Sequence, residues 1–493
     1  MRLVWISFFA WFAAGSAAQA AFAISDSPTQ NVQCRARACT ATARVANLNA
    51  AELAGRLESG NIKLIANQDA QDIRIEGSVS FTSGSLLNVM AYRSIIIGAP
   101  LTVMGPGAVI LNTGGTDTGG VLQFAGRGRI SFADSDSTLT IDAKPYRLAF
   151  DLATLASNVA AEPHGFHALA NDYDASADGV YASAPVATNL TGTFDGLGNT
   201  IRLLRIKSTA PGAQIGLFSD AGAIRNLHIE RAAMSGGPNS SVGGIAANCH
   251  VSVSSSTVSG RISGAANSSV GGICGMETGG FITRSHSTAA VTGRGTGGFI
   301  GGLVGHNFEG HIQLSYATGV VRAGKNWIAG GLAGHHEGQM EDSFASGAVI
   351  ADDGALVGGL IGDYAGGTIF DNYANGQVVG GVHSTVGGLI GQSNGDVASS
   401  YSSGAVASGS GNAVGGFVGI DQGILAMTDD YWDIDTSGQN HSAGNDPNDV
   451  GITGLTTAEF QSGLPSGFRS TIWAEDPTIN NGLPYLRANV PPR

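Results

Sequence analysis

A repeat dominates the second half of this sequence and restricts what it can fold into. Gly-Gly pairs return every 28 to 30 residues, and a small polar or acidic marker follows each pair by 13 to 15 residues. Self-similarity at a fixed period of roughly 20 to 50 residues is the signature of a repeat array that grows lengthwise. The pairs begin at Gly243, Gly271, Gly301, Gly330, Gly358, Gly387 and Gly415, and the markers are Ser256, Ser285, Ser315, Ser343, Asn372, Ser400 and Asp430.

Each repeat contains three short apolar segments separated by glycine or polar turns, which is typical of strands rather than helices. If one repeat forms one coil, equivalent residues stack at the strand spacing of roughly 4.8 Å and aliphatic columns fill the interior. We therefore predict an all-β fold, a right-handed parallel β-helix with about three strands per coil of about 29 residues and with N- and C-terminal caps. The columns are Ile245, Ile273, Leu303, Leu332, Leu360, Leu389 and Phe417; Val253, Ile282, Ile312, Met340, Ile369 and Val397; and Ile262, Val291, Val321, Val349, Val378 and Val406.

A fourth column is aromatic and directly follows the polar markers. Its structural interpretation is a stacked ladder that seals a corner of the coil, and its functional interpretation is a platform for sugar rings. We favour the ladder, and we keep Tyr316, Tyr373 and Tyr401 as ligand candidates. The column consists of His286, Tyr316, Phe344, Tyr373, Tyr401 and Tyr431.

The charge of the chain limits its partners. Charged residues make up 13% of the sequence and the net charge is −13. Nucleic acid and anionic membranes both require a basic surface to neutralise phosphate, and this chain has none. We therefore expect neither partner.

The N-terminus resembles a secretory signal peptide: Arg2, then an apolar run, then small residues that end at Ala20. We predict cleavage after Ala20, with a second small-residue site after Ala23. A membrane anchor is the weaker alternative because the apolar run is short. No later run is long enough to cross a membrane, so we expect a protein that is secreted or on the outer surface of a Gram-negative bacterium.

The chain has four cysteines. In an oxidising compartment Cys34 and Cys39 are expected to form a small-loop disulfide, whereas a metal pair would need a second ligand cluster. Cys249 and Cys274 lie in adjacent repeats, and their pairing stays open.

The best concentration of chemically active side chains lies in two central repeats. We take His306, Glu309, His335, His336, Glu337 and, in the same repeat position as His306 and His335, Asp363 as ligand candidates. A stacked His, His and Asp column could bind a metal, but the sequence His335-His336-Glu337 lacks the spacing of a zinc protease motif. The alternative is a solvated turn column.

No catalytic signature accompanies these residues. Lyases and glycosidases on β-helices gather carboxylates with Lys, Arg or calcium, and the repeats contain few basic residues. The acidic stretch from Asp429 to Asp435 could hold calcium, although an acidic turn is the simpler interpretation. We expect no catalytic residue, metal or cofactor.

Several segments are similar to those of a bacterial surface-protein family. The unit from Gly301-Gly302-Leu303-Val304-Gly305 to Ser315-Tyr316-Ala317-Thr318-Gly319 resembles a GLUG motif. Upstream Phe194-Asp195-Gly196 and downstream Tyr431-Trp432-Asp433 resemble the flanking segments of the same filamentous-haemagglutinin-like, adhesin-like proteins. The resemblance implies a surface scaffold, and the Asn-Pro-Asn signature of a two-partner secretion domain is absent from this sequence.

These observations predict the following organisation: signal peptide 1–20, N-terminal cap with a short helix 21–60, irregular haemagglutinin-like coils 61–145, excursion and lead-in coils 146–215, GLUG-type repeats 216–435 and C-terminal cap 436–493. Within the cap we expect a helix over 48–57, and within the excursion a helix over 148–155.

The predicted function is that of a non-enzymatic adhesin-like protein. It would bind glycans, host or matrix proteins or neighbouring cells, with an outer-membrane partner for its export. The alternative is a β-helix polysaccharide lyase or glycosidase whose site lies near the His and Glu cluster.

Overall fold

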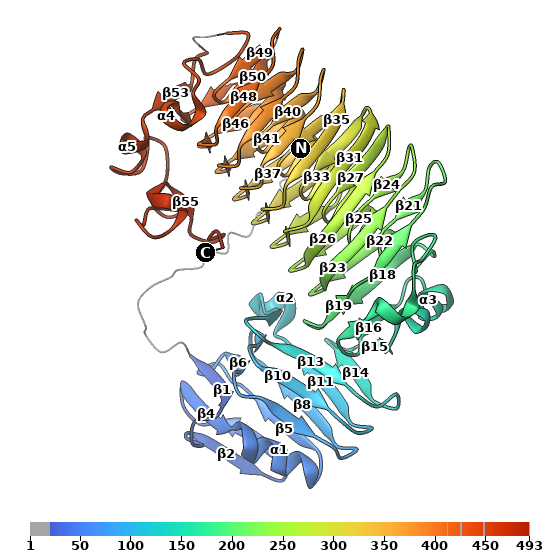
Figure 1. Cartoon of the computed structure of the whole chain (residues 1–493). Coiled ribbons are helices and arrows are strands. Elements are labelled where there is room, and N and C mark those ends of the chain that lie inside the picture. Colours follow the sequence, from blue (N-terminus) through green and yellow to red (C-terminus); the bar gives the residue numbers. More distant parts are fainter. Residues whose placement is uncertain (1–19, 412, 424–425, 447–448, 493) are drawn as a thin grey trace, which may run out of the picture. The chain divides into compact units, whose positions relative to one another are not determined.

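The computed structural model describes residues 20–411, 413–423, 426–446 and 449–492. It is all-β, with 50% strand and 8% helix, and its stacked parallel coils form about 15 turns of about 28 residues. The predicted parallel β-helix is therefore confirmed. The chain divides into two compact units, Met1–Arg129 with Thr140–Ala143 and Ile130–Leu139 with Lys144–Arg493 (Figure 1).

The first unit is built from short strands that enclose an aliphatic core, and all pair in parallel except the antiparallel hairpin of its second and third strands. Phe22 and Ile24 of its first strand are fully buried, and that strand pairs with two others in parallel. Its elements are β1 (Ala21–Ser25), β2 (Val32–Arg35), β3 (Ala38–Ala41), β4 (Val45–Asn49), α1 (Ala50–Glu58), β5 (Ile62–Ile65), β6 (Asp72–Ile75), β7 (Val79–Phe81), β8 (Leu86–Met90), β9 (Ile95–Ile97), β10 (Pro100–Val103), β11 (Ala108–Asn112), α2 (Gly115–Thr118) and β12 (Leu122–Phe124). Strands β13 (Arg129–Phe132) and β14 (Thr138–Ile141) span the boundary between the units.

The second unit contains the repeats, and each coil crosses three parallel sheets in the same order. Sheet 1 consists of β21 (Gln214–Ile215), β24 (Ser241–Val242), β27 (Ser268–Gly271), β32 (Gly298–Gly301), β36 (Ile328–Gly330), β40 (Leu356–Gly358), β44 (Thr385–Gly387) and β49 (Ala413–Gly415). Sheet 2 consists of β15 (Lys144–Ala149), β16 (Phe166–Leu169), β18 (Leu190–Asp195), β22 (Phe218–Arg225), β25 (Ala246–Ser254), β28 (Cys274–Thr278), β29 (Phe281–Thr283), β33 (Val304–Gln313), β37 (Ala333–Glu341), β41 (Ile361–Phe370), β45 (Ile390–Ser393), β46 (Asp396–Ala398), β50 (Val418–Asp421) and β51 (Met427–Thr428).

Sheet 3 completes each coil, and the next coil begins after it. It consists of β17 (Tyr173–Asp174), β19 (Thr200–Arg202), β20 (Arg205–Lys207), β23 (His228–Ser235), β26 (Thr257–Gly264), β30 (His286–Ser287), β31 (Ala290–Thr296), β34 (Tyr316–Ala317), β35 (Val321–Lys325), β38 (Phe344–Ala345), β39 (Val349–Ala351), β42 (Tyr373–Ala374), β43 (Val378–Gly380), β47 (Tyr401–Ser402), β48 (Val406–Ser408), β52 (Asp430–Asp433) and β53 (Ile452–Leu455).

The register of the strands follows the sequence repeat. Gly301 pairs with Gly330, which in turn pairs with Gly358, so that like residues stack from coil to coil. The three predicted aliphatic columns all face inward and are buried. At Gly301 a Cβ atom would lie 2.1 Å from the carbonyl oxygen of Val304, so the sharp corner between sheets 1 and 2 leaves no room for a side chain there.

Two predicted helices exist with shifted limits. The helix expected over 48–57 is α1, which begins at Ala50 because the two preceding residues continue strand β4. The helix expected over 148–155 is α3 (Leu152–Ala161), because residues up to Ala149 form β15 and the side chain of Asp151 caps the helix. A one-turn 3-10 helix, η1 (Ala175–Asp178), follows.

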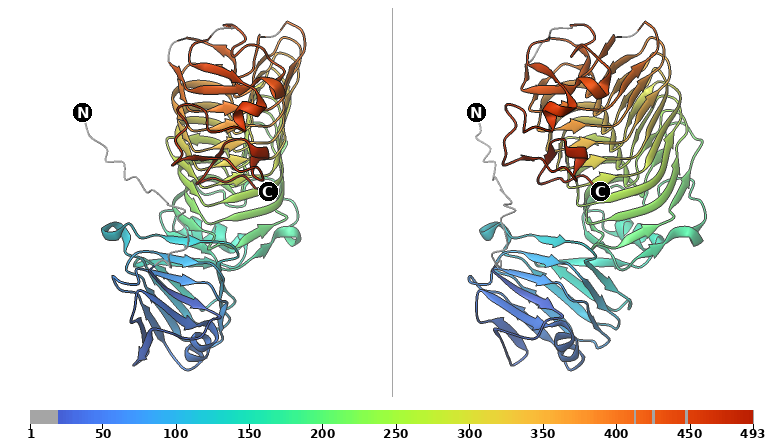
Figure 2. Two further views of the ribbon diagram at one scale, coloured as in Figure 1. Left: turned by 90° about the vertical axis from the view of Figure 1, so that its left-hand side faces the viewer. Right: turned by 60° about the vertical axis from the view of Figure 1, so that its left-hand side comes forward.

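The C-terminal segment leaves the last coil and runs back along the outside of the repeats (Figure 2). Asn489 donates hydrogen bonds to the backbone carbonyls of Ser315 and Asp342, which belong to coils far upstream in the sequence. The segment therefore covers the side of several coils. It contains α4 (Ile434–Ser437), α5 (Thr457–Phe460), β54 (Trp473–Ala474), η2 (Asn480–Gly482) and β55 (Tyr485–Leu486).

Candidate functional site

Two corners of the repeat coils differ in chemistry. The ladder corner, between sheets 2 and 3, carries the polar markers, all of which are buried. The backbone N–H of Ser285 donates to the hydroxyl oxygen of Ser315 over 3.2 Å, and the N–H of Ser315 donates to that of Ser343 over 3.1 Å. Since each hydroxyl satisfies an amide of the preceding coil, the marker column is a structural ladder.

The aromatic column next to these markers is covered by the C-terminal segment. The rings of Tyr373 and Tyr401 are stacked with centroids 5.2 Å apart and are fully buried, and Trp473 packs against both. They therefore offer no surface to a ligand. Tyr316 is half-buried, so it alone of the three tyrosine candidates keeps exposed surface.

The open corner lies between sheets 1 and 2, and outward side chains of both sheets face each other across it. One column comes from sheet 1 and the other from sheet 2, and neither contains Lys or Arg. The sheet 1 column is Gln214, Ser241, Ser269, Phe299, Ile328, Leu356, Thr385 and Ala413. The sheet 2 column is Asp220, Asn248, Met276, His306, His335, Asp363, Gln392 and Ile420.

Four of these side chains form a contiguous group, which we name the ring cluster: Phe299, His306, His335 and Asp363. The ring of Phe299 stacks on His306 with centroids 4.7 Å apart, and His306 meets His335 edge to face at 4.8 Å. Nδ1 of His335 lies 2.9 Å from Oδ2 of Asp363. Burial, with a smaller contribution from His335, lowers the pKa of His306 to about 4, so this ring is neutral near pH 7.

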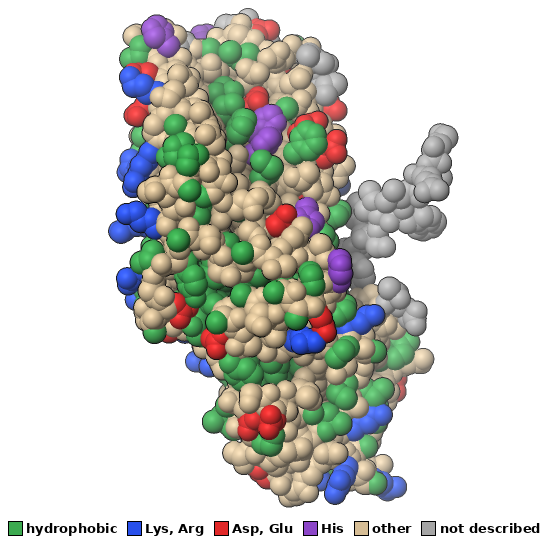
Figure 3. Space-filling view, turned by 90° about the vertical axis from the view of Figure 1, so that its right-hand side faces the viewer, with side chains coloured by type: hydrophobic (Ala, Val, Ile, Leu, Met, Phe, Trp, Pro, Cys, Tyr) green, Lys and Arg blue, Asp and Glu red, His purple; other side chains and the backbone are tan. Residues whose placement is uncertain are grey.

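A groove of about 480 Å³ occupies the adjoining coils of the same corner. Its polar lining includes Gln214, Ser241 and Asn248, together with an Asp220 and His250 pair whose Oδ1 and Nδ1 atoms lie 2.6 Å apart. Figure 3 shows one face of the repeat unit, where histidine, acidic and hydrophobic side chains lie among other polar ones and most Lys and Arg side chains lie at the margin.

His336 does not join the ring cluster, because it points to the opposite side of the strand from His335. It is fully buried, and its Nδ1 atom accepts a hydrogen bond from the amide of Asn307 over 2.7 Å. Burial lowers the pKa of His336 to about 3. Together with Glu277 these residues form an inward polar row through successive coils, which sequence reasoning missed because strand alternation was not assigned residue by residue.

The two remaining candidates lie in the bend that follows the histidines in sheet 2. Glu309 is exposed with a backbone φ of 56°, and Glu337 is half-buried. Glu309 follows His306 by three residues and Glu337 follows His335 by two, and neither carboxylate belongs to the ring cluster.

Metal and calcium chemistry gain no support from side-chain positions. Within the described ranges, no group of three or more His, Cys, Asp or Glu side chains is arranged to hold a metal ion. In the acidic stretch, Asp430 belongs to the marker ladder and accepts from the N–H of Ser400, while Asp433 caps helix α4. These two carboxylates thus have structural partners.

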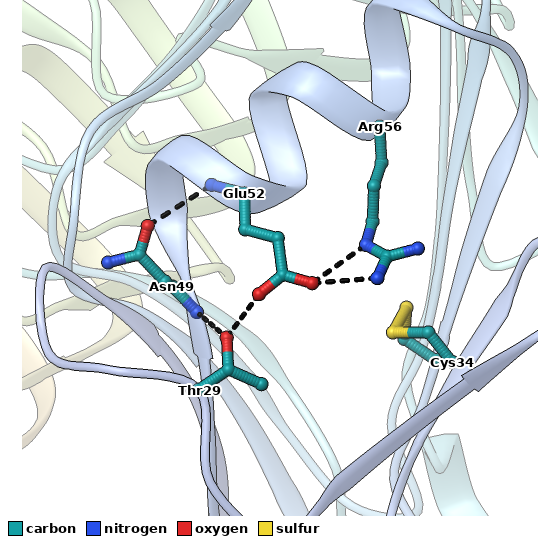
Figure 4. Close-up of a disulfide and its surroundings, with 6 residues drawn as sticks. Thr29, Cys34, Asn49, Glu52 and Arg56 are labelled. Atoms are coloured by element: carbon teal, nitrogen blue, oxygen red, sulfur yellow. Dashed lines mark hydrogen bonds and ion pairs between the residues drawn. A yellow bond between two sulfur atoms is a disulfide. The ribbon is translucent and has the colours of Figure 1, made fainter.

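The structure contains the expected disulfide between Cys34 and Cys39, which joins β2 to β3 in a hairpin beside α1 (Figure 4). Next to it the side chain of Asn49 caps α1 by accepting from the N–H of Glu52, and the Glu52 carboxylate pairs with Thr29 and Arg56. A second disulfide links Cys249 to Cys274, and Cys249 lines the open-corner groove.

Comparisons with known proteins assign no family to the chain. No family model matches it, and no curated protein matches it. Among solved structures, it is similar to a protein from Bacteroides ovatus described as a "putative immunoglobulin A1 protease", with 19% identity, a TM-score of 0.39, and coverage of 70% of this chain and 92% of that chain. No helix in the described part of the chain has the length and apolar character needed to cross a membrane.

Proposed function

We propose that this chain is a secreted or surface-exposed, non-enzymatic, adhesin-like protein that binds glycan or protein ligands through the open corner. The observation that carries the proposal is the groove lined by residues of both outward columns, which continues into the ring cluster. Concave sites with a few polar groups and aromatic surface are the usual form of a ligand site.

The pattern of variation among coils supports this choice. At the ladder corner nearly every coil has the same kind of residue, because the residue serves coil stacking. At the open corner the sheet 2 column changes from Asp220 to Met276, His306 and Gln392, and stacking requires none of these side chains. Surface side chains that vary from coil to coil on a constant scaffold are expected of a recognition surface.

The positions of the carboxylates at the open corner support the enzymatic alternative less well than they support the adhesin-like proposal. Glycosidases need two carboxyl groups within roughly 5 to 10 Å. In the two open-corner columns the carboxylates are Asp220 and Asp363, which are five strands apart, or about 24 Å at the usual strand spacing. An isolated His335 and Asp363 pair lacks both a second carboxylate and a nucleophile in these columns.

We also propose export with cleavage after Ala20. Residues 1–19 lie outside the described part, but strand β1 begins at Ala21, and Phe22 is fully buried in the core of the first unit. Cleavage after Ala23 would remove this side chain from the core. Sequencing the N-terminus of the exported protein distinguishes the two sites.

The function is tested with the exported chain on a glycan array and on matrix proteins, alongside adhesion of a deletion strain. We expect binding by the protein and reduced adhesion of the strain. No binding and unchanged adhesion would contradict the proposal. Degradation of any polysaccharide in a panel, abolished by His306→Ala with His335→Ala, would favour the enzyme instead.

A further inference from the structure

The ring cluster is a local feature that the fold does not require. In the coils on either side, the positions of Phe299 are taken by Ser269 and Ile328, and the coil before His306 has Met276. The coil of Ser269 and Met276 stacks in the same register with no ring at either outward position. At the ladder corner, by contrast, the rings recur through successive coils and lie under the C-terminal segment. The rings at the open corner are half-buried.

The ring cluster and the polar groove form one continuous surface. Met276, which lines the groove, is the direct neighbour of His306 in sheet 2, and Ser269 is the neighbour of Phe299 in sheet 1. From Asp220 to Asp363 the surface covers six strands, or about 24 Å along the axis. This length suits a chain of several sugar units lying across the coils.

The two parts offer the two kinds of contact that pyranose rings need. Phe299 and His306 stack on each other and are half-buried, so the ring surface that this pair leaves exposed is available to the apolar face of a sugar. The amides of Gln214 and Asn248 and the hydroxyl of Ser241 can donate to and accept from sugar hydroxyls. The arrangement is that of a stacking subsite followed by hydrogen-bonding subsites.

The charge of the surface restricts the ligand further. Its ionisable groups are Asp220, Asp363, their histidine partners and His306, and neither outward column contains a Lys or Arg that could pair with a uronate or sulfate. An anionic chain would meet carboxylates of like charge, which disfavours it. A neutral glycan meets no such cost.

We propose that the open corner from Asp220 to Asp363 binds a neutral polysaccharide chain, with one pyranose ring packed against the exposed side of the Phe299 and His306 pair. This deepens the proposed function and rests on it, since it names the ligand class of the same surface. The polymer lies along the solenoid axis, with adjoining sugars over the polar groove.

The test is calorimetric titration of the exported full-length protein with neutral oligosaccharides of glucose, mannose and N-acetylglucosamine, and with oligogalacturonate as the anionic probe. We expect at least one neutral series to bind and Phe299→Ala to raise its Kd about tenfold or more, because the variant loses the ring against which the sugar packs. Phe299→Tyr keeps the ring and is expected to stay within about threefold of wild type by the same reasoning.

Thr385→Ala is the matched control, because Thr385 is half-buried in the same outward column three coils beyond Phe299 and one coil beyond Asp363, outside the proposed surface. It is expected to leave the Kd unchanged, and thermal unfolding shows whether each variant is folded. Tighter binding of oligogalacturonate than of every neutral chain, or a Kd unaffected by Phe299→Ala, would overturn the inference. If no neutral glycan binds while protein ligands and adhesion persist, the inference fails and the proposed function stands; if nothing binds and adhesion is unchanged, both fail.

Discussion

The ladder corner and the open corner belong to the same coils, yet they serve different purposes. Ser315 at the ladder corner is buried, hydrogen-bonded to the neighbouring coils and covered by the C-terminal segment. His306 lies in the same coil but faces outward at the open corner, where it is half-buried. Among the described residues, no segment packs an aromatic cluster over that corner as the C-terminal segment does over the ladder corner. A residue type that repeats in every coil is explained by stacking. A residue type that appears in only one or two coils needs another explanation, and recognition of a ligand is the one we propose.

The largest effect is expected from Tyr401→Ala at the ladder corner. Tyr401 is fully buried, stacks on Tyr373 and donates a hydrogen bond to the carbonyl of Pro484. Removing such a ring leaves a cavity and undocks the C-terminal segment, at a cost of about 3 to 5 kcal/mol. Urea unfolding measures the loss, and limited proteolysis reports release of the segment.

His286→Ala is the control for this substitution, since His286 is the half-buried first ring of the same aromatic column. It is expected to cost less than Tyr401→Ala and to leave the C-terminal segment protected. A loss of unfolding free energy below about 1 kcal/mol for Tyr401→Ala would show that the aromatic column does not hold the C-terminal segment in place.

The second prediction concerns Glu277, whose side chain points inward just behind the open corner. Burial raises its pKa from 4.5 to about 7, although the N–H of Gly280 donates to the carboxyl. A Cβ atom at Gly310 would overlap both Oε2 of Glu277 and Oδ1 of Asn307, so these oxygens are neighbours. Neither oxygen has another hydrogen-bond partner among the described residues, and a protonated Glu277 carboxyl can donate to the Asn307 oxygen.

The sign of the pH dependence follows from this raised pKa. Below pH 4.5 the carboxyl is protonated in both states and its full contribution to stability is present. As pH rises through about 7, the unfolded chain ionises first, and about 3 kcal/mol of stability is lost. In Glu277→Gln the amide donates to Asn307 at every pH, so the difference in unfolding free energy between variant and wild type should grow from pH 4 to pH 8. A constant difference would contradict the assignment.

The third prediction tests the marker ladder. Ser315→Ala removes the acceptor for the buried N–H of Ser285, and an unsatisfied buried donor costs about 1 to 3 kcal/mol. Ser254→Ala is the control, because Ser254 is half-buried and its hydroxyl takes no part in the ladder. Urea unfolding measures the free energy of unfolding of each variant. Equal losses for Ser315→Ala and Ser254→Ala would show that the marker hydroxyls stabilise the stack no more than a half-buried hydroxyl outside the ladder does.

The sequence predicted the fold because its signals are local and repeated. Gly-Gly spacing and three aliphatic columns are sufficient to place each coil on the next, and the disulfide at Cys34 follows from short spacing. The site was only partly predictable. Candidates His335 and His336 are adjacent in sequence, but the first faces the open corner and the second faces the core, since successive residues of a strand point to opposite sides.

Other parts of the site depend on contacts that are distant in sequence. Phe299 was not predicted because its partner His306 lies on a different sheet of the same coil, beyond the corner at Gly301. The burial of Tyr401 depends on a segment more than seventy residues downstream. Neither contact leaves a repeated signal, so only the folded chain shows them.

The smallest effect is expected from Asn248→Ala at the open corner. Asn248 lines the groove and is half-buried, and substitutions at such positions usually change stability by less than about 0.5 kcal/mol. Ser256→Ala, in the same coil but at the ladder corner, should cost more because the N–H of Leu227 donates to its hydroxyl. Urea unfolding of the pair gives the sharpest form of the comparison, since both variants lose one polar side chain from one coil. A larger loss for Asn248→Ala would mean that the open corner also stabilises the stack, and its variable residues would then need a structural explanation.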